Sequence, residues 1–232
     1  MLDAIRAAKR PVALTGAGIS APSGVPTFQT LWKGRPVREF LGRDYFERDL
    51  AGFLELFCHM ERWCDAEPNA AHLALAREGV RVITQNIDGL HQKAGSERVI
   101  ELHGSLRIVR CTACGKEVPA KRACAEIRPL IAAGDREGAR SSFRCACGGP
   151  LDIDVVLYGD PVRGIAEAAD TVAGCDLLLV IGTALEVYPA ASLPDIAREY
   201  GAGVLIENTD CIAALTERKG MEDEPTWAAE PI

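Results

Sequence analysis

Short apolar runs recur along the chain, separated by longer stretches of helical composition. The runs are PVALT (11–15), VRVITQ (80–85), DLLLVIGT (176–183) and GVLIEN (203–208). Continuous runs of valine, isoleucine and leucine are typical of strands that are buried on both faces. Because they alternate with segments such as NAAHLALARE (69–78) and AASLPDIAREYG (190–201), the pattern predicts an α/β fold whose mainly parallel, doubly wound sheet carries helices on both faces.

Two segments interrupt this alternation. Residues 28–64 are rich in aromatic and charged side chains, and we expect a helical module there. Residues 107–152 contain clustered cysteines and few apolar runs, so this segment needs a cross-link to hold its fold. We therefore assign 28–64 and 107–152 to a small lobe, and 1–27, 65–106 and 153–232 to a large lobe that carries the sheet.

Two close pairs of cysteines supply the cross-link. CTAC contains Cys111 and Cys114, CAC contains Cys145 and Cys147, and a glycine follows each pair. Four thiolates in two such turns are the ligands of tetrahedral zinc in a zinc ribbon, and a site closed by four cysteines leaves no position for a catalytic water. We expect one structural zinc ion. The other cysteines, interpreted as small buried hydrophobic residues, are Cys58, Cys64, Cys124, Cys175 and Cys211.

Length, charge and cysteine usage narrow the functional class. The 232 residues suffice for one large core or for a large domain that carries a smaller one. A net charge of -7 gives no general attraction for nucleic acid, and no apolar run approaches the length that crosses a bilayer. The amphipathic start MLDAIRAAKR has no apolar signal region, and without export nine cysteines favour free thiols and metal over disulfides. We expect a cytoplasmic protein with no nucleic-acid or membrane partner.

A glycine-rich loop, TGAGISAPSG (15–24), follows the first predicted strand. It places Gly16, Ala17 and Gly18 at the carboxyl end of that strand, where open α/β sheets bind their ligands. Glycines there let the backbone approach a diphosphate. Taken alone, the loop is equally compatible with an ordinary turn between a strand and a helix.

The ends of the other predicted strands provide polar companions for this loop. Asn86 and Asp88 follow the second strand, Gly182 and Thr183 follow the third, and residues 207–210 follow the fourth. An amide and a carboxylate suit a carboxamide and ribose hydroxyls, whereas a glycine turn suits a phosphate. Together these strand ends predict an extended crevice for a dinucleotide.

Histidine is the side chain that titrates near neutral pH without special tuning. Of the four histidines, His59 and His72 lie in predicted helices and His91 follows a turn. His103, in VIELHGSL, ends an apolar run at the same edge as the glycine loop. We therefore expect His103 to be the candidate acid or base.

In order and spacing, the motifs of this chain resemble those of the sirtuin family. They are GAGISAPSGVPTF (16–28), TQNIDGLH (84–91), ELHGS (101–105), the two cysteine pairs, VVLYGD (155–160), GTALEVYPA (182–190) and IEN (206–208). The match extends from about Ala13 to Asp210, which is most of the chain. It implies a Rossmann-like NAD-binding lobe and a small lobe of a zinc ribbon and a helical module, with NAD and an acylated lysine meeting between them.

The resemblance also implies roles for particular residues. NAD-binding residues would be Gly16, Ala17, Gly18, Ile19, Ser20, Phe28, Gln29, Gln85, Asn86, Ile87, Asp88, Gly182, Thr183, Ala184, Asn208, Thr209 and Asp210. His103 matches the catalytic base, and Asn86 joins it at the reaction centre. Two segments would pair with the backbone of a substrate peptide by strand addition: Val156, Leu157, Tyr158, Gly159 and Asp160, and Leu185, Glu186 and Val187.

The reaction implied by the resemblance is removal of an acyl group, acetyl above all, from protein lysine. NAD is consumed as co-substrate, nicotinamide leaves, and His103 takes a proton from a ribose hydroxyl on the way to O-acyl-ADP-ribose. Two alternatives stay open on the same fold. One is NAD hydrolysis or mono-ADP-ribosyl transfer, and the other is a sensor that binds NAD or ADP-ribose without turnover.

The chain departs from the family pattern at several positions. Thr27 and Gln29 stand where the family has an aspartate and an arginine, and Ala184 replaces a serine. Cys58 and Glu61 align with the tyrosine and arginine that bind acidic acyl groups in desuccinylase-type members, so we expect Glu61 to repel such groups. After Asp210 the chain ends in MEDEPTWAAEPI (221–232), with no clear final helix.

Overall fold

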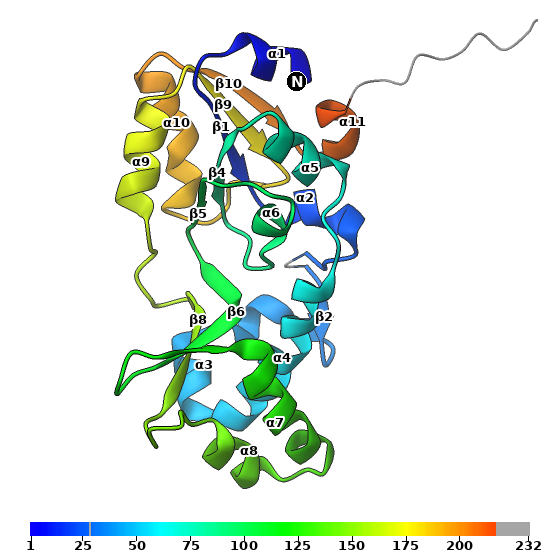
Figure 1. Cartoon of the computed structure of the whole chain (residues 1–232), viewed down its shortest axis with the longest axis vertical. Helices are drawn as coiled ribbons and strands as arrows, with labels where there is room; N and C mark the ends of the chain where they lie inside the picture. The colour runs from blue at the N-terminus through cyan, green and yellow to red at the C-terminus, as the bar shows by residue number, and fades with distance from the viewer. Residues whose placement is uncertain (28, 217–232) are drawn as a thin grey trace, which may run out of the picture.

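The protein folds into two lobes, which lie one above the other in Figure 1. The structure is a computed structural model that describes residues 1–27 and 29–216. The upper lobe contains a five-stranded parallel sheet with the strand order β10-β9-β1-β4-β5. Its strands are β1 (Pro11–Thr15), β4 (Arg81–Thr84), β5 (Val99–Glu101), β9 (Leu177–Ile181) and β10 (Gly203–Glu207). The four apolar runs of the sequence form β1, β4, β9 and β10, so the predicted parallel sheet is confirmed.

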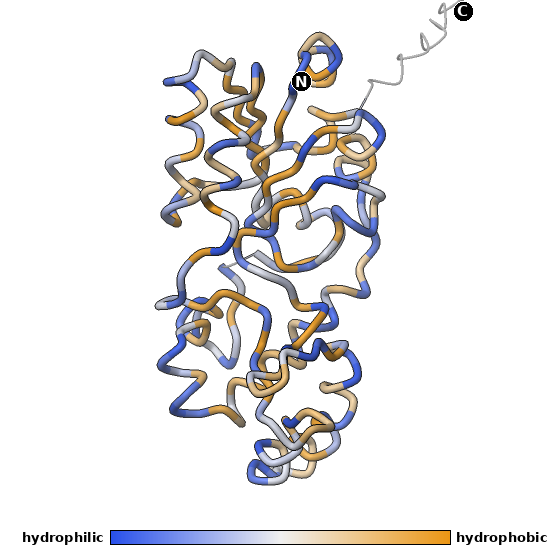
Figure 2. The backbone as a smooth tube through the Cα atoms, turned by 60° about the vertical axis from the view of Figure 1, so that its left-hand side comes forward, coloured by the Kyte–Doolittle hydropathy of each residue, from blue (hydrophilic) through white to orange (hydrophobic). Residues whose placement is uncertain are grey.

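Helices cover both faces of this sheet (Figure 1). Successive side chains of a strand point to opposite faces, so Val12 and Leu14 of β1 pack with α9 and α10, whereas Ala13 packs with α5 and α11. The helices of this lobe are α1 (Leu2–Ala7), α2 (Ala17–Ser20), α5 (Ala70–Arg77), α6 (Leu90–Lys93), α9 (Ile165–Ala173), α10 (Leu193–Glu199) and α11 (Cys211–Leu215), with short 3-10 turns at Ala21–Ser23 and Ala190–Ser192. In Figure 2 long hydrophobic stretches of backbone run through the middle of the molecule.

The lower lobe combines helices with a small antiparallel sheet. Its three-stranded sheet has the order β7-β6-β8, and β2 pairs with β3 in a separate hairpin. Its elements are β2 (Leu31–Trp32), β3 (Arg35–Pro36), α3 (Arg43–Arg48), α4 (Leu50–Met60), β6 (Gly104–Cys111), β7 (Glu117–Pro119), α7 (Ala120–Ala132), α8 (Arg136–Ser142) and β8 (Leu151–Val155), with 3-10 turns at Val37–Phe40 and Glu61–Asp65.

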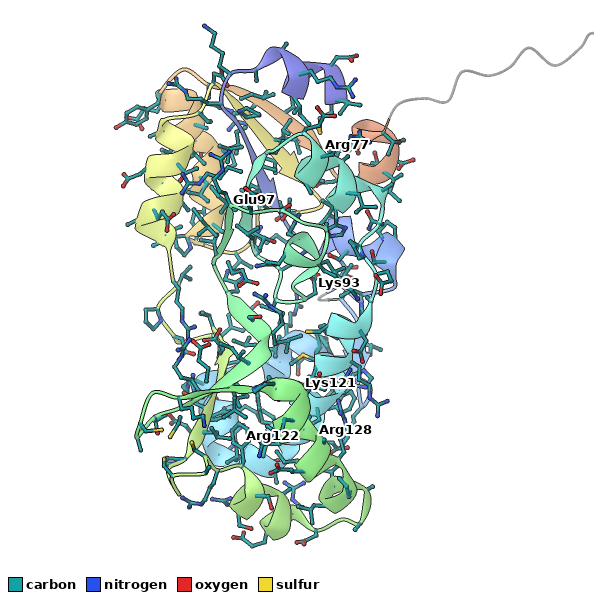
Figure 3. The ribbon with its side chains drawn as sticks, in the orientation of Figure 1. Arg77, Lys93, Glu97, Lys121, Arg122 and Arg128 are labelled. Atoms are coloured by element: carbon teal, nitrogen blue, oxygen red, sulfur yellow. The ribbon has the colours of Figure 1, made fainter. Side chains whose placement is uncertain are left out.

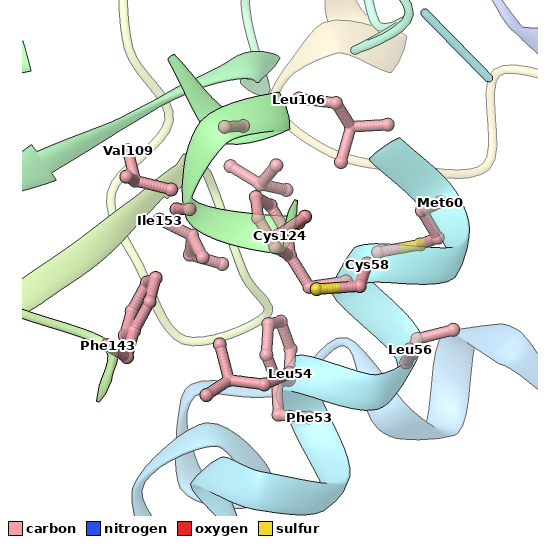
Figure 4. Close-up of a cluster of buried hydrophobic side chains, with 14 of the residues drawn as sticks. Phe53, Leu54, Leu56, Cys58, Met60, Leu106, Val109, Cys124, Phe143 and Ile153 are labelled. Carbon is pink, nitrogen blue, oxygen red and sulfur yellow. The ribbon is translucent and has the colours of Figure 1, made fainter. Parts of the chain in front are cut away.

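One hydrophobic core joins the two sequence segments of this lobe. Phe53, Leu54 and Phe57 of α4 pack with Val109 of β6 and Ile153 of β8, as Figure 4 shows for part of the cluster. Asp49 caps the start of α4 by accepting a hydrogen bond from the backbone of Gly52. We still propose the division into lobes, and the shared core supports it.

Charged contacts tie the 3-10 turn at Glu61–Asp65 and the residues after it to both lobes. Lys93 of α6 donates to the carbonyl of Ala66 and pairs with Glu67, and Lys121 of α7 pairs with Asp65. Figure 3 labels Lys93 and Lys121. Because these pairs are exposed to solvent, they contribute little to the stability of the fold. Of the helices within residues 1–216, none is long and apolar enough to cross a membrane.

Candidate active site

A cavity of about 490 Å³ opens where the carboxyl ends of the parallel strands face the small lobe. Four strand ends contribute to it, as the sequence predicts: the loop after β1, the turns after β4 and β9, and Asn208 after β10. The predicted residues that line it are Gly16, Ala17, Gly18, Gln29, Gln85, Ile87, His103, Val156, Leu157, Tyr158, Gly159, Asp160, Gly182, Thr183, Ala184, Glu186, Val187 and Asn208. A second, smaller hollow adjoins it and is lined by Asn86 and Asp88 with Met60 and Trp63.

The glycines of the two loops allow the loops to touch. The backbone N–H of Gly18 donates to the carbonyl of Gly182 at 2.8 Å. A Cβ atom on Gly18 would lie 2.7 Å from the Cα atom of Gly182, and one on Gly16 would lie 2.6 Å from the Cβ atom of Thr183. Gly182 also has a positive φ of 65°. Close packing of one loop against the other therefore requires glycine at these positions.

Amide side chains brace the turn after β9. Asn208 accepts a hydrogen bond from the backbone N–H of Thr183 at 3.0 Å and donates to the carbonyl of the same residue at 2.9 Å. Gln85 donates to the Thr183 hydroxyl at 2.8 Å, and that hydroxyl accepts from the N–H of Leu185. Leu185 has a positive φ of 56°, which is uncommon for a branched side chain. Asn208 and Gln85 thus fix the shape of the cavity wall.

A buried polar network lies behind Asn86 and Asp88. Ser20 donates to the Asp88 carboxylate at 2.7 Å and accepts from the Asn86 amide at 3.1 Å. The Nε2 atom of His72 lies 3.3 Å from the same hydroxyl, and His91 lies 2.9 Å from the Thr15 hydroxyl. Burial lowers the pKa of His72 to about 4 and the pKa of His91 to about 3, so both rings are neutral at pH 7.

Burial also raises the pKa of the Asp88 carboxyl, against hydrogen bonds from the Leu90 backbone and Ser20 that favour its charge. The two donors hold the carboxylate in one orientation beside Asn86. Ser20 is fully buried and does not line either cavity. It therefore positions Asn86 and Asp88 rather than facing the cavity itself.

His103 projects into the main cavity from the turn between β5 and β6. Its Nδ1 atom lies 3.0 Å from the carbonyl oxygen of Gln85. A carbonyl only accepts, so Nδ1 carries the hydrogen and Nε2 is the unprotonated nitrogen. Burial lowers the pKa of His103, which keeps the ring neutral at pH 7. Nε2 is therefore free to accept a proton, as the predicted role of His103 as a general base requires.

The predicted substrate segment 156–160 is anchored at one edge. The N–H of Val156 donates to the carbonyl of His103, and Tyr158 exchanges backbone hydrogen bonds with Leu41 and Arg43. Arg43 also holds the Asp160 carboxylate with two nitrogens, at 2.9 and 2.8 Å, and pairs with Asp152.

The side chain of Arg43 lowers the pKa of Asp160. Within the described chain, the backbone N–H and C=O of Gly159 form no backbone hydrogen bond. Pairing of this segment with a peptide strand stays a prediction.

The four predicted zinc ligands converge at the far end of β6. Their sulfur atoms all lie within 4.8 Å of one another, with separations of 3.6 Å for Cys111–Cys147, 3.8 Å for Cys114–Cys145 and 3.5 Å for Cys114–Cys147. Zinc–sulfur bonds of about 2.3 Å place the corners of a tetrahedron about 3.8 Å apart, so the four thiols fit the ion. Cys111, Cys114, Cys145 and Cys147 would hold structural zinc, which would cross-link the ends of the small sheet.

Several predicted site residues lie away from the cavities. Thr209 bonds to the Glu207 side chain, and Asp210 caps α11 by accepting from the backbone of Ala213. Ile19 of the glycine loop is fully buried against α5, and Leu185 packs on the sheet. Phe28 and the segment 221–232 lie outside the described residues.

The structure corrects the roles expected of Cys58 and Glu61. Neither residue lines the two cavities. Glu61 is 3% exposed and pairs with Arg128, which cancels the charge that was expected to repel an acidic acyl group. Cys58 and Cys124 are buried in the hydrophobic core of the small lobe, which confirms their interpretation as small buried hydrophobic residues, and the two thiols also contact each other.

The sequence did not predict some residues of the site. Leu41, Val162 and Tyr188 line the main cavity, Trp63 lines the smaller one, and Arg43 anchors the substrate segment. Leu41, Trp63 and Arg43 come from the helical module, where no apolar strand or motif marks the position of a residue in space. Tyr188 was indicated only by its place in the motif GTALEVYPA (182–190).

Comparison with known proteins gives one consistent result. The profile of the Sir2 family matches residues 16–189. An NAD-dependent protein deacetylase of Sulfolobus acidocaldarius is 42% identical over 206 residues, which cover 85% of this chain and 78% of the relative. An NAD-dependent protein deacylase 2 of Pyrobaculum aerophilum is 39% identical over 223 residues, covering 90% of this chain and 83% of the relative.

Solved structures agree with these relatives. The complex of Sir2 with a p53 peptide and NAD⁺ superimposes with a TM-score of 0.78 at 29% identity, covering 92% of this chain and 93% of that one. A Sir2 homologue in complex with NAD gives a TM-score of 0.77 at 38% identity, covering 90% of this chain and 81% of the other. Sir2Tm bound to a propionylated peptide gives 0.77 at 30% identity, with coverage of 92% and 93%.

Proposed function

Because this chain belongs to the Sir2 family, we propose that it is an NAD-dependent protein deacylase that removes acetyl and other uncharged acyl groups from lysine. Its products are free lysine, nicotinamide and O-acyl-ADP-ribose. The partner is an acyl-lysine protein, and the net charge of -7 favours this over nucleic acid. The use of four of the nine cysteines in one candidate zinc site supports a cytoplasmic location.

The observation that carries the proposal is the neutral His103 at the meeting point of two binding surfaces. On one side lie the glycine loop and Gln85, which suit NAD; on the other lies the segment that begins at Val156 and suits an extended peptide. The carbonyl of His103 bonds directly to Val156, so the base and the peptide segment keep a fixed separation. A ribose hydroxyl that enters between them would transfer its proton to Nε2 of His103.

The residues around the cavity also support a preference for uncharged acyl groups. Among the described lining residues none is cationic, whereas Asp160 and Glu186 are anionic. Leu41, Ile87 and Val156 offer apolar contacts to an acyl chain. An acidic acyl group would lose its hydration there without gaining a counter-ion, which disfavours it.

The test uses the purified full-length chain, NAD, and two peptides of one sequence that carry acetyl-lysine or succinyl-lysine. Nicotinamide, O-acetyl-ADP-ribose and free ADP-ribose are followed over time. We expect nicotinamide release that depends on the acetyl peptide, matched by O-acetyl-ADP-ribose, and at least about 10-fold slower turnover of the succinyl peptide.

Two outcomes would contradict the proposal. Equal nicotinamide release without peptide, with free ADP-ribose as product, would identify an NAD hydrolase. Gln29 and Ala184, which line the cavity in place of an arginine and a serine, make this the second candidate function. Binding of NAD without release of nicotinamide under any condition would instead identify a sensor.

A further inference from the structure

Two cysteines that the zinc site does not use lie side by side in the core of the small lobe. Cys58 comes from α4 and Cys124 from α7, and both are buried, at 3% and 0% exposed. The Cys124 thiol and the Cys58 sulfur interact through a hydrogen bond. Figure 4 shows the two side chains meeting between the helices.

The surroundings of the pair make its two thiols unequal. The hydrogen bond from Cys124 and the positive charge of Arg128 lower the pKa of Cys58, although burial opposes them. Arg128 donates to the backbone carbonyl of Cys58 at 2.9 Å and also pairs with Glu61, so its guanidinium is held next to this thiol. The same hydrogen bond raises the pKa of Cys124. Cys58 is therefore the better nucleophile of the two thiols, and Cys124 is the one that keeps its proton.

We propose that Cys58 and Cys124 form a reversible disulfide when a peroxide reaches the small lobe. The Cys58 thiolate attacks one oxygen of hydrogen peroxide, the O–O bond breaks, and water leaves after taking up a proton, which gives a sulfenic acid on Cys58. The sulfur of Cys124 then attacks that of Cys58; the S–S bond forms, the S–O bond breaks, and hydroxide leaves with the Cys124 proton as a second water. Two thiols are oxidised and one peroxide is reduced to two waters.

The bond would join the two sequence segments of the small lobe. Cys58 belongs to the helical module, and Cys124 belongs to the segment that carries the zinc ligands. A disulfide between segments so far apart in the chain restricts the unfolded state strongly. Oxidation should therefore raise the thermal stability of the protein.

Peptide mapping tests the connection in the unmodified protein. The zinc-loaded chain is treated with hydrogen peroxide, alkylated and digested with trypsin without reduction. We expect the peptide 49–62 linked to the peptide 123–136, lighter by two hydrogen atoms than the two separate peptides, and its loss after treatment with dithiothreitol. Oxidation of other cysteines while 49–62 and 123–136 stay unlinked would overturn the proposal.

Variants give an independent readout, and Cys64 provides the matched control. Cys64 lies in the 3-10 turn that follows α4, close to Cys58 in the sequence. Burial raises its pKa to about 12, and within the described residues it forms no hydrogen bond to another thiol. Peroxide should raise the melting temperature of wild type and of C64A by roughly 5–10 °C, reversibly, and leave C58A and C124A unchanged. A rise of the same size in C58A would contradict the proposal.

Discussion

The Nδ1 atom of His103 and the carbonyl oxygen of Gln85 lie 3.0 Å apart. This single contact decides which nitrogen of the ring can act as a base, because the carbonyl fixes the hydrogen on Nδ1. It also links the base to the wall of the cavity, since the side chain of Gln85 bonds to Thr183. The proposed base and the turns proposed to bind NAD thus depend on the same residue.

Replacement of His103 by glutamine should abolish deacylation without unfolding the protein. The substitution removes the proton acceptor, so we expect kcat to fall by about 10²–10⁴-fold. Circular dichroism and thermal melting should match wild type. Turnover within a few-fold of wild type would show that another group accepts the proton.

The pH profile of the wild-type enzyme offers a second check of His103. Burial lowers its pKa below the ordinary value of 6.5, and a base works only when neutral. Activity should therefore rise with pH along a limb whose midpoint lies below 6.5, and level off toward neutral pH. The measurement is kcat/KM for the acetyl peptide across the acid range, and a midpoint above 6.5 would contradict the assignment.

The buried histidines behind Asp88 should make stability depend on pH. The unfolded chain binds protons at these residues near pH 6.5, whereas folded His72 binds one only near pH 4 and His91 near pH 3. Their contribution is thus fully present above pH 6.5 and is lost progressively as the pH falls toward the folded values. For His72 alone the loss is on the order of 3 kcal/mol.

Urea unfolding at pH 7.5 and at about pH 5 measures the larger part of this loss, which is complete only below the folded pKa of His72. His72→Gln keeps an N–H near the position of Nε2 and removes the titration, so its stability should fall less between the two conditions. Carboxylates whose pKa is lowered, such as Asp160, lose their contribution only at still lower pH. Equal dependence on pH in wild type and H72Q would exclude His72 as the cause.

Gln29 lines the cavity where the family pattern has an arginine, and it should limit the affinity for NAD. A neutral amide lacks the charge and the forked donors of a guanidinium, a difference worth about 1–3 kcal/mol where the contact is made. Gln29→Arg should therefore lower the KM for NAD by roughly 5-fold or more, with the KM for the peptide unchanged. Gln29→Lys serves as the control for charge alone; an unchanged KM for NAD in both variants would show that the residue makes no contact.

Much of the fold was predictable because its signals are local. Buried strands such as β1 and β9 are continuous apolar runs, and the zinc ligands stand in two short pairs. The carboxyl edge of a parallel sheet then brings Gly16, Asn86 and His103 into one region without further information. The hydrophobic pattern and the topology together are therefore enough to predict the sheet and the region of the site.

The rest depends on contacts between segments that no local pattern encodes. Arg43 reaches Asp160 across more than a hundred residues, and Cys58 meets Cys124 through the packing of two helices. Glu61 is the opposite case. The resemblance to the family predicted it at a substrate-binding position, whereas in the structure it is buried in an ion pair with Arg128. Side-chain partners of this kind are set by tertiary packing alone.

Removal of the metal should destabilise the small lobe. Elemental analysis should find one zinc ion per chain, and a strong chelator should lower the melting temperature, because the four cysteine ligands then lose the ion that cross-links them. Cys147→Ser should reduce metal content in the same way. Zinc-free protein that melts at the same temperature as the loaded form would show that the ion is not a cross-link.

Arg43 should control peptide binding without touching NAD. Its guanidinium holds Asp160 and Asp152, and its backbone pairs with Tyr158, while the side chain is absent from the lining of the cavity. Arg43→Met removes both ion pairs but keeps most of the apolar length. Segment 156–160 should then be less well ordered, and the KM for the acetyl peptide should rise by roughly 10-fold.

The KM for NAD provides the internal control for this variant, and Arg43→Lys provides the matched substitution. Lysine keeps the charge but cannot bind a carboxylate through two nitrogens, so we expect an intermediate KM for the peptide. Steady-state kinetics with each substrate varied in turn separate the two effects. An equal rise in both KM values would mean that Arg43 supports the whole cavity, because only a local role predicts a change confined to the peptide.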